Sequence, residues 1–392
     1  MVEWKPLNKI VSSISTGLNP RTNFVLNEND AYLFYVTVKE ITSNKVVFSK
    51  STDRITPSAK EIINKRSKLE KGDILFSGIG TIGKVAYVDI NTDNWDCSES
   101  VFLIKPAESD IKGKYLYYIL TSNIAKSQYE KGSAGAIMKG VRKKTLENIK
   151  IPIPSLEEQN RIVGILDTFT DSIENLKQQI AQRRKQFEFY RDQLLDLEGK
   201  EGVEMKTLGE ICDIKGDYGI SASSKPFDGN CRYIRITDIT DSGSLNDDVV
   251  SADYNKPVKE ALKEGDILFA RTGATVGKTL LFHKEYGECL FAGYLIRYRV
   301  KTMIVLPKFV FHFAHSNDYY KWVKANLVEG AQPNISALKY NSLQIPVPPP
   351  PEQSRIVSIL DTFEASISNL EAQLEQRQKQ YEYYRNQLLT FE

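Results

Sequence analysis

Apolar side chains recur every three or four positions along two long stretches of this chain, residues 162–197 and 356–391. With Arg183 counted as a polar position in the series, the first stretch keeps a seven-residue period for about five heptads, which is typical of a coiled coil. Its apolar positions are Ile162, Leu166, Phe169, Ile173, Leu176, Ile180, Phe187, Tyr190, Leu194 and Leu197. Prolines precede both stretches, so we expect the helices to begin near Glu157 and Glu352 and to run about 40 residues, or ~60 Å.

The two stretches are copies of one sequence. Residues 345–392 repeat residues 151–198 without a gap, 194 positions later, and 29 of the 48 aligned pairs are identical. Such a duplication implies an approximate internal two-fold, so we expect the two helices to lie antiparallel and to contact each other. The predicted helix seam consists of Ile162, Leu166, Phe169, Ile173, Leu176 and Arg183 in the first copy, and Ile356, Leu360, Phe363, Ile367, Leu370 and Arg377 in the second.

Arg183 and Arg377 occupy the same seam position in both copies, and two interpretations stay open. Their stems could lie along the seam while the charged ends reach solvent. Alternatively, a polar seam residue could fix the register and orientation of the helices. Outer-face residues are also identical between the copies, which suggests a shared partner on that face; they are Lys185, Gln186 and Glu188, with Lys379, Gln380 and Glu382.

Each helix follows a larger block, and the two blocks are related but diverged. Alternating segments at 35–41 and 233–239 predict strands, and a turn followed by a buried strand is expected at 71–76 and 264–269. Each block then contains a glycine-rich hairpin, an aromatic helical stretch and a closing loop. The pattern is mixed α+β rather than alternating βαβ.

We therefore expect an α+β protein with two globular mixed α/β domains, separated by two long antiparallel coiled-coil helices in a pseudo-two-fold internal repeat. The expected domains are residues 1–150 and 199–344. The helical segments are residues 151–198 and 345–392.

Composition limits the class of protein. A hydrophobic content of 41% and a charged content of 26% fit an ordinary globular protein with real cores. No apolar run approaches the roughly 18 residues that span a bilayer, and the start has no apolar segment of signal-peptide type. The four cysteines are widely spaced, which indicates reduced thiols. We expect a cytoplasmic protein with no membrane partner.

The glycine-rich hairpins invite a nucleotide-binding interpretation, but both motifs are broken. Gly78-x-Gly80-x-x-Gly83 fits a dinucleotide fingerprint, whereas the second copy has Arg271 where that motif needs its first glycine. The first copy also nearly fits a phosphate-binding loop, yet Val85 stands where magnesium needs Ser or Thr. Each copy breaks a different requirement, so the duplication has kept neither nucleotide motif.

Other catalytic or metal-binding patterns are absent from the sequence. His312 and His315 lie three apart on a predicted helix, but no cysteine or carboxylate cluster is recognisable to complete a zinc site, so we expect packing or solvated histidines and no metal. Asp196 with Glu204-x-Lys206 resembles a nuclease pattern, yet it lies in the linker after the helix and is short enough to arise by chance. No catalytic residues are predicted.

The net charge of +2 does not by itself indicate a nucleic-acid-binding protein, but local clusters of cations do. Lys139, Arg142, Lys143 and Lys144 put four cations into six residues beside glycines, and we expect them to contact phosphates. Lys84 and Lys278 end the two glycine-rich hairpins. Those hairpins are either plain turns that need φ > 0 or loops that present lysine to a phosphate.

Two diverged blocks, each closing with a proline-rich start to a matched long helix, resemble the DNA-specificity subunit of type I restriction-modification systems. The resemblance covers essentially the whole chain. The residues that carry it are Ile151-Pro152-x-Pro154, Glu158-Gln159-x-Arg161-Ile162-Val163 and Ile165-Leu166-Asp167, their second copies from Ile345 to Asp361, and Gly72-Asp73-Ile74-Leu75 with Gly265-Asp266-Ile267-Leu268.

The resemblance implies that each block is a target-recognition domain for one half of a bipartite site on double-stranded DNA. The helices would hold the halves at a fixed separation and dock two methyltransferase subunits, and restriction subunits would join the complex. The chain itself would be non-catalytic, within a complex that acts as an adenine DNA methyltransferase and a type I site-specific endonuclease. No cofactor is expected here, because S-adenosylmethionine would bind the methyltransferase partner.

The divergence between the blocks hides the residues that read bases. Arg271 is a candidate for guanine, and Gln332 and Asn334 are candidates for adenine. The phosphate candidates are Lys84, Lys139, Arg142, Lys143, Lys144, Lys278 and Lys339. Two alternatives remain at this point: a nucleotide-dependent transferase that uses the glycine-rich loops, and a coiled-coil scaffold with no DNA role.

Overall fold

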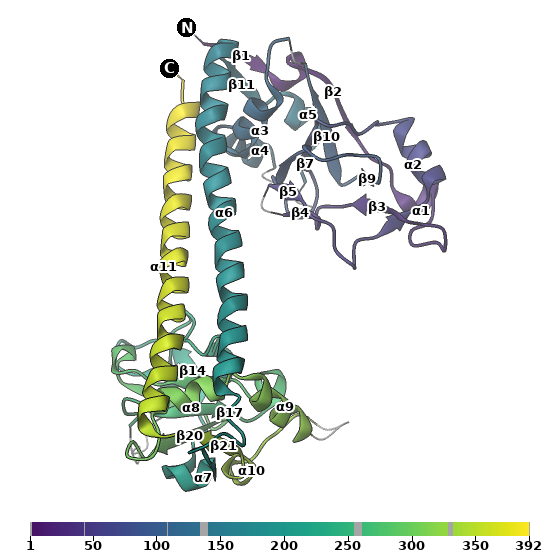
Figure 1. Cartoon of the computed structure of the whole chain (residues 1–392). Helices are drawn as coiled ribbons and strands as arrows, with labels where there is room; N and C mark the ends of the chain where they lie inside the picture. The colour runs from purple at the N-terminus through teal and green to yellow at the C-terminus, as the bar shows by residue number, and fades with distance from the viewer. Residues whose placement is uncertain are drawn as a thin grey trace. The chain divides into compact units, whose positions relative to one another are not determined.

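A computed structural model describes residues 2–42, 44–107, 109–133, 140–254, 261–327 and 332–391 (Figure 1). The chain divides into two compact units. Unit 1 is Met1–Lys177 together with Gln373–Glu392, and unit 2 is Gln178–Ala372. Each unit thus combines one block with the beginning of one long helix and the end of the other.

The two long helices have the predicted length. Helix α6 is Leu156–Leu195 and helix α11 is Pro350–Leu389, each 40 residues. Helix α11 begins two residues before Glu352, so Pro350 and Pro351 lie in its first turn instead of preceding it. Proline is tolerated there because the first-turn N–H groups have no partner within the helix.

Unit 1 is built on an antiparallel four-stranded sheet in the order β2-β10-β7-β8. It also contains a three-stranded sheet in the order β6-β3-β9. The strands are β1 (Glu3–Pro6), β2 (Val11–Thr16), β3 (Leu33–Val36), β4 (Ile41–Thr42), β5 (Lys45–Val46), β6 (Arg54–Ile55), β7 (Ile74–Ser77), β8 (Val85–Tyr87), β9 (Trp95–Cys97), β10 (Val101–Pro106) and β11 (Lys150–Ile153). The helices are η1 (Leu7–Lys9), α1 (Pro20–Asn23), α2 (Pro57–Asn64), α3 (Gly113–Thr121), α4 (Asn123–Ser133) and α5 (Lys143–Glu147).

Unit 2 repeats the main sheet in the equivalent order β13-β20-β17-β18. Its strands are β12 (Glu204–Thr207), β13 (Cys212–Tyr218), β14 (Ser223–Pro226), β15 (Arg232–Ile234), β16 (Val250–Asp253), β17 (Ile267–Ala270), β18 (Thr279–Leu281), β19 (Cys289–Phe291), β20 (Leu295–Val300) and β21 (Gln344–Val347). Its helices are α7 (Leu208–Ile211), η2 (Ile236–Asp238), η3 (Gly273–Thr275), η4 (Lys284–Tyr286), α8 (Pro307–Phe313), α9 (Asn317–Ala325) and α10 (Ala337–Asn341). The mixed α+β class and the duplication are therefore confirmed.

The strands predicted at 35–41 and 233–239 are shorter than expected. Strand β3 ends at Val36, because the Glu40 carboxylate accepts hydrogen bonds from the backbone N–H and the hydroxyl of Thr37 and closes a turn. Strand β15 ends at Ile234, because Asp238 accepts in the same way from the backbone N–H of Arg235. A local side-chain acceptor outcompetes the strand in both blocks.

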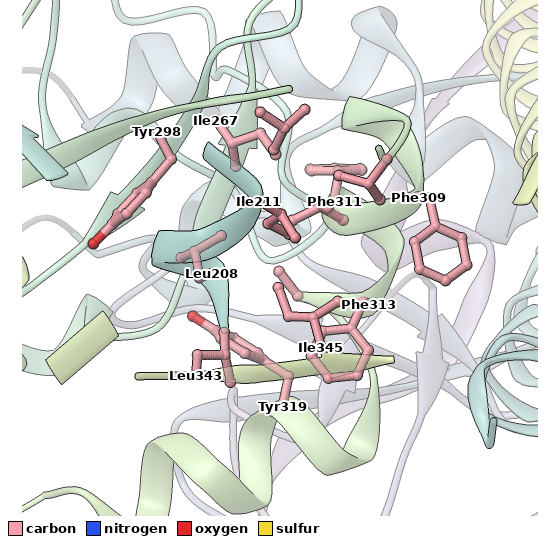
Figure 2. Close-up of a cluster of buried hydrophobic side chains, with 14 of the residues drawn as sticks. Leu208, Ile211, Ile267, Tyr298, Phe309, Phe311, Phe313, Tyr319, Leu343 and Ile345 are labelled. Atoms are coloured by element: carbon pink, nitrogen blue, oxygen red, sulfur yellow. The ribbon is translucent and has the colours of Figure 1, made fainter. Parts of the chain in front are cut away.

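The first seam residues of each helix belong to a block core as well. Ile356 and Leu360 of α11 are fully buried in the main core of unit 2, whose centre is shown in Figure 2. Ile162 and Leu166 of α6 lie in the equivalent core of unit 1. The apolar stripe therefore attaches each block to its helix as well as serving the helix pair.

The helices contact each other through equivalent aromatic pairs in the two units. In unit 1, Phe169 of α6 stacks on Tyr384 of α11 with ring centroids 5.3 Å apart. In unit 2, Phe363 of α11 stacks on Tyr190 of α6 at 5.4 Å. An early residue of one helix thus meets a late residue of the other in both units, which confirms the antiparallel pairing.

The seam arginines lie over the same phenylalanines. The Arg377 guanidinium carbon is 5.7 Å from the centre of the Phe169 ring, and that of Arg183 is 5.9 Å from the Phe363 ring. Both arginines are half-buried. Each guanidinium therefore lies on an aromatic face of the opposite helix, an attraction of about 0.5–1 kcal/mol at exposed sites. Whether it also fixes the register stays a prediction.

Candidate nucleic-acid interface

A buried glutamine in the repeated Glu-Gln-x-Arg-Ile element connects each block to its helix. Gln159 accepts from the backbone N–H of Lys112 at 2.9 Å and donates to the carbonyls of Asp110 and Pro154 at 3.1 and 3.0 Å. Gln353 makes the equivalent bonds to Leu306, Ile304 and Pro348. Lys112 and Leu306 are the N-cap residues of α3 and α8, and neither caps its helix with its own side chain. The glutamine amide therefore supplies a hydrogen-bond acceptor at the start of each helix.

Replacing Gln353 with leucine is expected to destabilise unit 2 by about 2–4 kcal/mol, because it removes the partner of one N–H and two carbonyls, all buried or partly buried. Urea unfolding followed by circular dichroism measures the change. Gln376→Leu, at an exposed position of the same helix, is the matched control and is expected to change stability by less than about 0.5 kcal/mol. Equal stability of the two variants would contradict the role assigned to Gln353.

The repeated Gly-Asp-Ile-Leu element is also explained by a buried contact. Asp73 is paired with Lys105 of β10 at 2.9 Å, and Asp266 is paired with Arg299 of β20 at 2.6 Å. Both aspartates are almost fully buried. Burial raises the pKa of Asp73 above its ordinary value despite the opposing hydrogen bond from Lys105. These pairs hold the strand before each hairpin against its central neighbour.

The glycine-rich segments are hairpin turns between β7 and β8 and between β17 and β18. Gly83 has φ +81°, and a Cβ added to it would lie 2.4 Å from the Tyr129 hydroxyl oxygen. A Cβ on Gly78 would lie 2.4 Å from the Phe102 ring. Chain direction and close packing therefore explain these glycines without a bound phosphate.

Lys84 and Lys278 form contacts within their own blocks. Lys84 Nζ donates to the carbonyl of Val38 at 3.0 Å. Lys278 Nζ donates to the carbonyl of Ile239 at 3.3 Å and is paired with Asp241 at 2.7 Å. The hydrogen bond from Lys278 lowers the pKa of Asp241 below its ordinary value. Both lysines connect their hairpin to the segment that follows β3 or β15, where Val38 and Ile239 lie. An ammonium has three N–H donors, so these contacts use only part of its capacity to donate.

Three predicted base readers lie together in unit 2. Arg271 Nε donates to Asn334 Oδ1 at 3.3 Å, although the residues are 63 positions apart in the chain. The backbone joins them, because Thr272 and Asn334 form an antiparallel bridge and Gly273 N–H donates to the carbonyl of Pro333. Gln332 precedes Pro333 and is exposed. Lys339 is exposed on the following helix, α10.

Sequence reasoning missed two aromatic residues at this site. The Arg271 guanidinium carbon lies 4.9 Å from the centre of the Tyr218 ring. The backbone N–H of Arg271 donates to the carbonyl of Tyr294 at 3.0 Å. Tyr218 is 47% exposed and Tyr294 is 61% exposed. Their sequence neighbourhoods have no motif, so only the fold brings them to Arg271.

The basic run of unit 1 is at the corresponding place before the helix. Arg142, Lys143 and Lys144 are exposed at the start of α5, and Lys143 approaches Glu147 at 3.8 Å. Lys139 lies outside the described residues. Gly140 forms a β-bridge with Ile79 of the first hairpin, as Asn334 does with Thr272 of the second.

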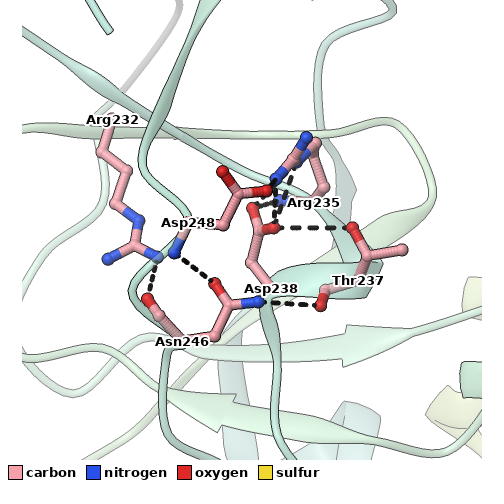
Figure 3. A network of polar contacts seen from close by, with 6 residues as sticks. All are labelled: Arg232, Arg235, Thr237, Asp238, Asn246 and Asp248. Atoms are coloured by element: carbon pink, nitrogen blue, oxygen red, sulfur yellow. Dashed lines mark hydrogen bonds and ion pairs between the residues drawn. The ribbon is translucent and has the colours of Figure 1, made fainter. Parts of the chain in front are cut away.

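A second polar network, which the sequence did not indicate, orders the segment after β15 in unit 2 (Figure 3). Arg235 contacts Asp238 and Asp248, each at 2.6 Å. Arg232 donates to the carbonyl of Asn246 at 2.7 Å. The hydrogen bond to Asp238 raises the pKa of Arg235 above its ordinary value. These guanidinium groups are engaged inside the block and stabilise the segment that Lys278 contacts.

His312 and His315 are buried, and the expectation that no carboxylate cluster is present is wrong for His312. His312 of α8 lies with Asp361 and Glu364 of α11, and one ligand atom from each lies within 4.8 Å of the others. This cluster could not be recognised in the sequence, because 49 positions separate His312 from Asp361. Lys308 already places an ammonium 2.7 Å from Asp361 and 3.3 Å from Glu364, so these ion pairs account for the cluster as a contact between α8 and α11.

The equivalent contact in unit 1 keeps the lysine–aspartate pair and has Tyr118 where unit 2 has His312, which supports a structural role. Lys114 is paired with Asp167 at 2.7 Å, and the Tyr118 hydroxyl donates to the same carboxylate at 2.6 Å. His315, in contrast, has no carboxylate partner among the contacts that the structure describes. Its Nδ1–H donates to the carbonyl of Phe311, and burial lowers its pKa to about 4. It is therefore a buried packing residue, which is one of the two roles predicted for the histidines.

Within the part of the chain that the structure describes, no helix is both long and apolar enough to cross a membrane.

Comparison with known proteins gives one consistent result. The family model for the type I restriction modification DNA specificity domain matches residues 1–183 and again residues 200–378. The EcoR124I/EcoR124II specificity subunit of Escherichia coli is 30% identical, over 100% of this chain and 94% of that protein. A putative type I restriction enzyme specificity subunit of Haemophilus influenzae is 31% identical, over 72% of this chain and 73% of that protein.

Solved structures agree on the fold. A chain from a study of assembly and conformational transition of the type I R-M system has a TM-score of 0.61 at 19% identity, covering 99% of this chain and 96% of its own. The type I restriction-modification S subunit of M. genitalium has a TM-score of 0.56 at 16% identity, covering 100% of this chain and 97% of its own. Two family-model matches that together span most of the chain establish that it belongs to the type I restriction-modification DNA specificity family.

Proposed function

We propose that this chain is the DNA sequence-specificity subunit of a type I restriction-modification complex and that it recognises a bipartite DNA site. One observation carries the proposal. The family domain occurs twice, and each copy supplies an equivalent hairpin on an equivalent sheet with a different residue at its turn, Gly78 in one and Arg271 in the other. A shared frame with different turn residues suits a protein that reads two different half-sites.

In this proposal, residues 1–150 and 199–344 are the two target-recognition domains, and residues 151–198 and 345–392 set the distance between the half-sites. Phosphate contacts come from the exposed cations Arg142, Lys143 and Lys144 in the first domain and Lys339 in the second. Lys139 is included on its sequence alone. Lys84 and Lys278 each donate to one carbonyl and contribute through their remaining N–H groups.

The proposed protein partners are two methyltransferase subunits and, with them, restriction subunits. Two equivalent docking surfaces are available on the outer faces of the helices. Lys185 and Glu188 of α6 are exposed, and so are their counterparts Lys379 and Glu382 of α11. This chain then acts without catalysis of its own, in the cytoplasm, while the methyltransferase subunits bind S-adenosylmethionine.

The two alternatives have no support. A nucleotide-dependent transferase would need a phosphate-binding loop, but the glycines of the hairpins are explained by chain direction and by close packing against Phe102 and Tyr129. A scaffold without a DNA role leaves the repeated specificity domain unexplained.

Methylation mapping tests the function. The chain is combined with its methyltransferase partner and S-adenosylmethionine, and methylated adenines are located by sequencing random genomic DNA. We expect one bipartite motif with a fixed gap, and no methylation when either protein is omitted. Methylation without a motif, or the same motif in the absence of this chain, would contradict the proposal.

A further inference from the structure

We propose that Arg271 reads a guanine in the half-site bound by the second block, and that the first block has no equivalent reader. The inference rests on the proposed function and deepens it, because it names one base and the side chain that selects it. Three observations support it: the contacts that each arginine of the second block makes, the geometry around Arg271, and the comparison with Gly78.

Arg271 differs from the other arginines of residues 199–344 in what its guanidinium contacts. Arg235, Arg297 and Arg299 are paired with carboxylates, and Arg232 donates to a backbone carbonyl. Among the described residues, Arg271 is paired with no carboxylate, and its side-chain hydrogen bond uses Nε toward Asn334. The guanidinium edge formed by the two terminal nitrogens, Nη1 and Nη2, can therefore donate to a ligand.

The site also holds Arg271 in one orientation before DNA arrives. Tyr218 covers one face of the guanidinium, Asn334 accepts from Nε, and the backbone on both sides of the residue is bonded to Tyr294 and Ile335. Arginine presents two parallel N–H groups that match O6 and N7 of guanine in the major groove. A side chain that is already oriented loses less conformational entropy on binding.

The first block has the same backbone arrangement without the side chain. Gly78 N–H donates to the carbonyl of Ser100 at 3.1 Å, as Arg271 N–H donates to that of Tyr294. The Gly78 carbonyl accepts from Val141 at 2.8 Å, as the Arg271 carbonyl accepts from Ile335 at 2.8 Å. A Cβ at Gly78 would lie 2.4 Å from the Phe102 ring, so no side chain fits there. The guanine contact therefore belongs to one half-site only.

The test is methylation mapping with the complete complex, comparing the chain with Arg271→Ala and Arg271→Lys. Both variants are expected to lose about ten- to hundredfold of the preference for guanine at one position of one half-site. Lysine keeps the charge but not the paired N–H groups, so it separates base reading from phosphate attraction. The other half-site is the control within the same molecule, and its preference is expected to stay unchanged.

Tyr218 is a positioning residue in this arrangement. Tyr218→Leu is expected to weaken the same guanine preference, whereas Tyr218→Phe keeps the ring and is expected to retain it. If the wild-type complex methylates a bipartite site but Arg271→Ala leaves the motif intact, or lowers methylation at all sites alike, the guanine assignment is wrong and the specificity function stands. If the wild-type complex has no bipartite motif, the proposed function itself fails.

Discussion

Deleting one heptad from each long helix is expected to shorten the gap between the two half-sites by about three base pairs. Residues 177–183 and 371–377 occupy equivalent positions in the two copies. Removing them shortens each helix by ~10 Å and keeps the seven-residue phase of both seams. At ~3.4 Å per base pair, this length corresponds to about three base pairs. Methylation mapping gives the new gap directly.

The rate of methylation at the new site should also fall. Three base pairs rotate the DNA grooves by roughly a third of a turn, whereas removing a whole heptad leaves the helix faces in phase. Each deletion also removes a seam arginine, so the matched control is the full-length Arg183→Leu/Arg377→Leu variant. That variant is expected to keep the original gap. If the deletion variant keeps the wild-type gap between the half-sites, the helices do not set that spacing.

A fragment of residues 1–198 is expected to form a symmetric dimer instead of a monomer. In the complete chain, the core of unit 1 includes Tyr381 and Leu389 from the end of α11. Their counterparts in the first copy, Phe187 and Leu195, are part of the fragment. A second fragment chain can therefore supply the missing side chains, with Phe169 stacking on the partner's equivalent of Tyr384, which is Tyr190.

Sedimentation equilibrium measures the mass of this fragment. Two variants distinguish dimerisation through the helix pair from non-specific association. Phe169→Asp removes the stacked ring and is expected to leave the fragment monomeric. Phe189→Asp replaces a phenylalanine that is 61% exposed on the same helix and is expected to leave the dimer intact. A wild-type fragment that remains monomeric at high concentration would show that the antiparallel pairing does not hold it together.

Much of the fold could be predicted because the chain contains the same pattern twice. The repeat revealed both long helices, and period and proline positions placed their starts to within two residues. The strand lengths were less predictable. Glu40 and Asp238 end their strands early through hydrogen bonds to a backbone N–H three residues before them, and alternation of apolar residues carries no sign of that competition.

The candidate site was harder to predict, because its residues are gathered by the sheet. Arg271 and Asn334 were recognisable as donors of a suitable kind, but Tyr218 has no local signal and meets Arg271 only through the fold. The cluster of His312, Asp361 and Glu364 was missed for the same reason. Conversely, Gln159 and Gln353 belong to the repeated element, and the sequence alone does not distinguish a buried connection from a docking surface.

The discontinuous make-up of unit 1 has a consequence for how the chain folds on the ribosome. Unit 2 is one continuous segment that is complete once residue 372 has been synthesised, whereas unit 1 also needs residues 373–392. Nascent domains usually finish folding in the order in which they emerge. Here the block that is translated first completes its core last, after its later-made copy. Until residues 373–392 are made, the apolar side chains of unit 1 that pack against Tyr381 and Leu389 stay uncovered.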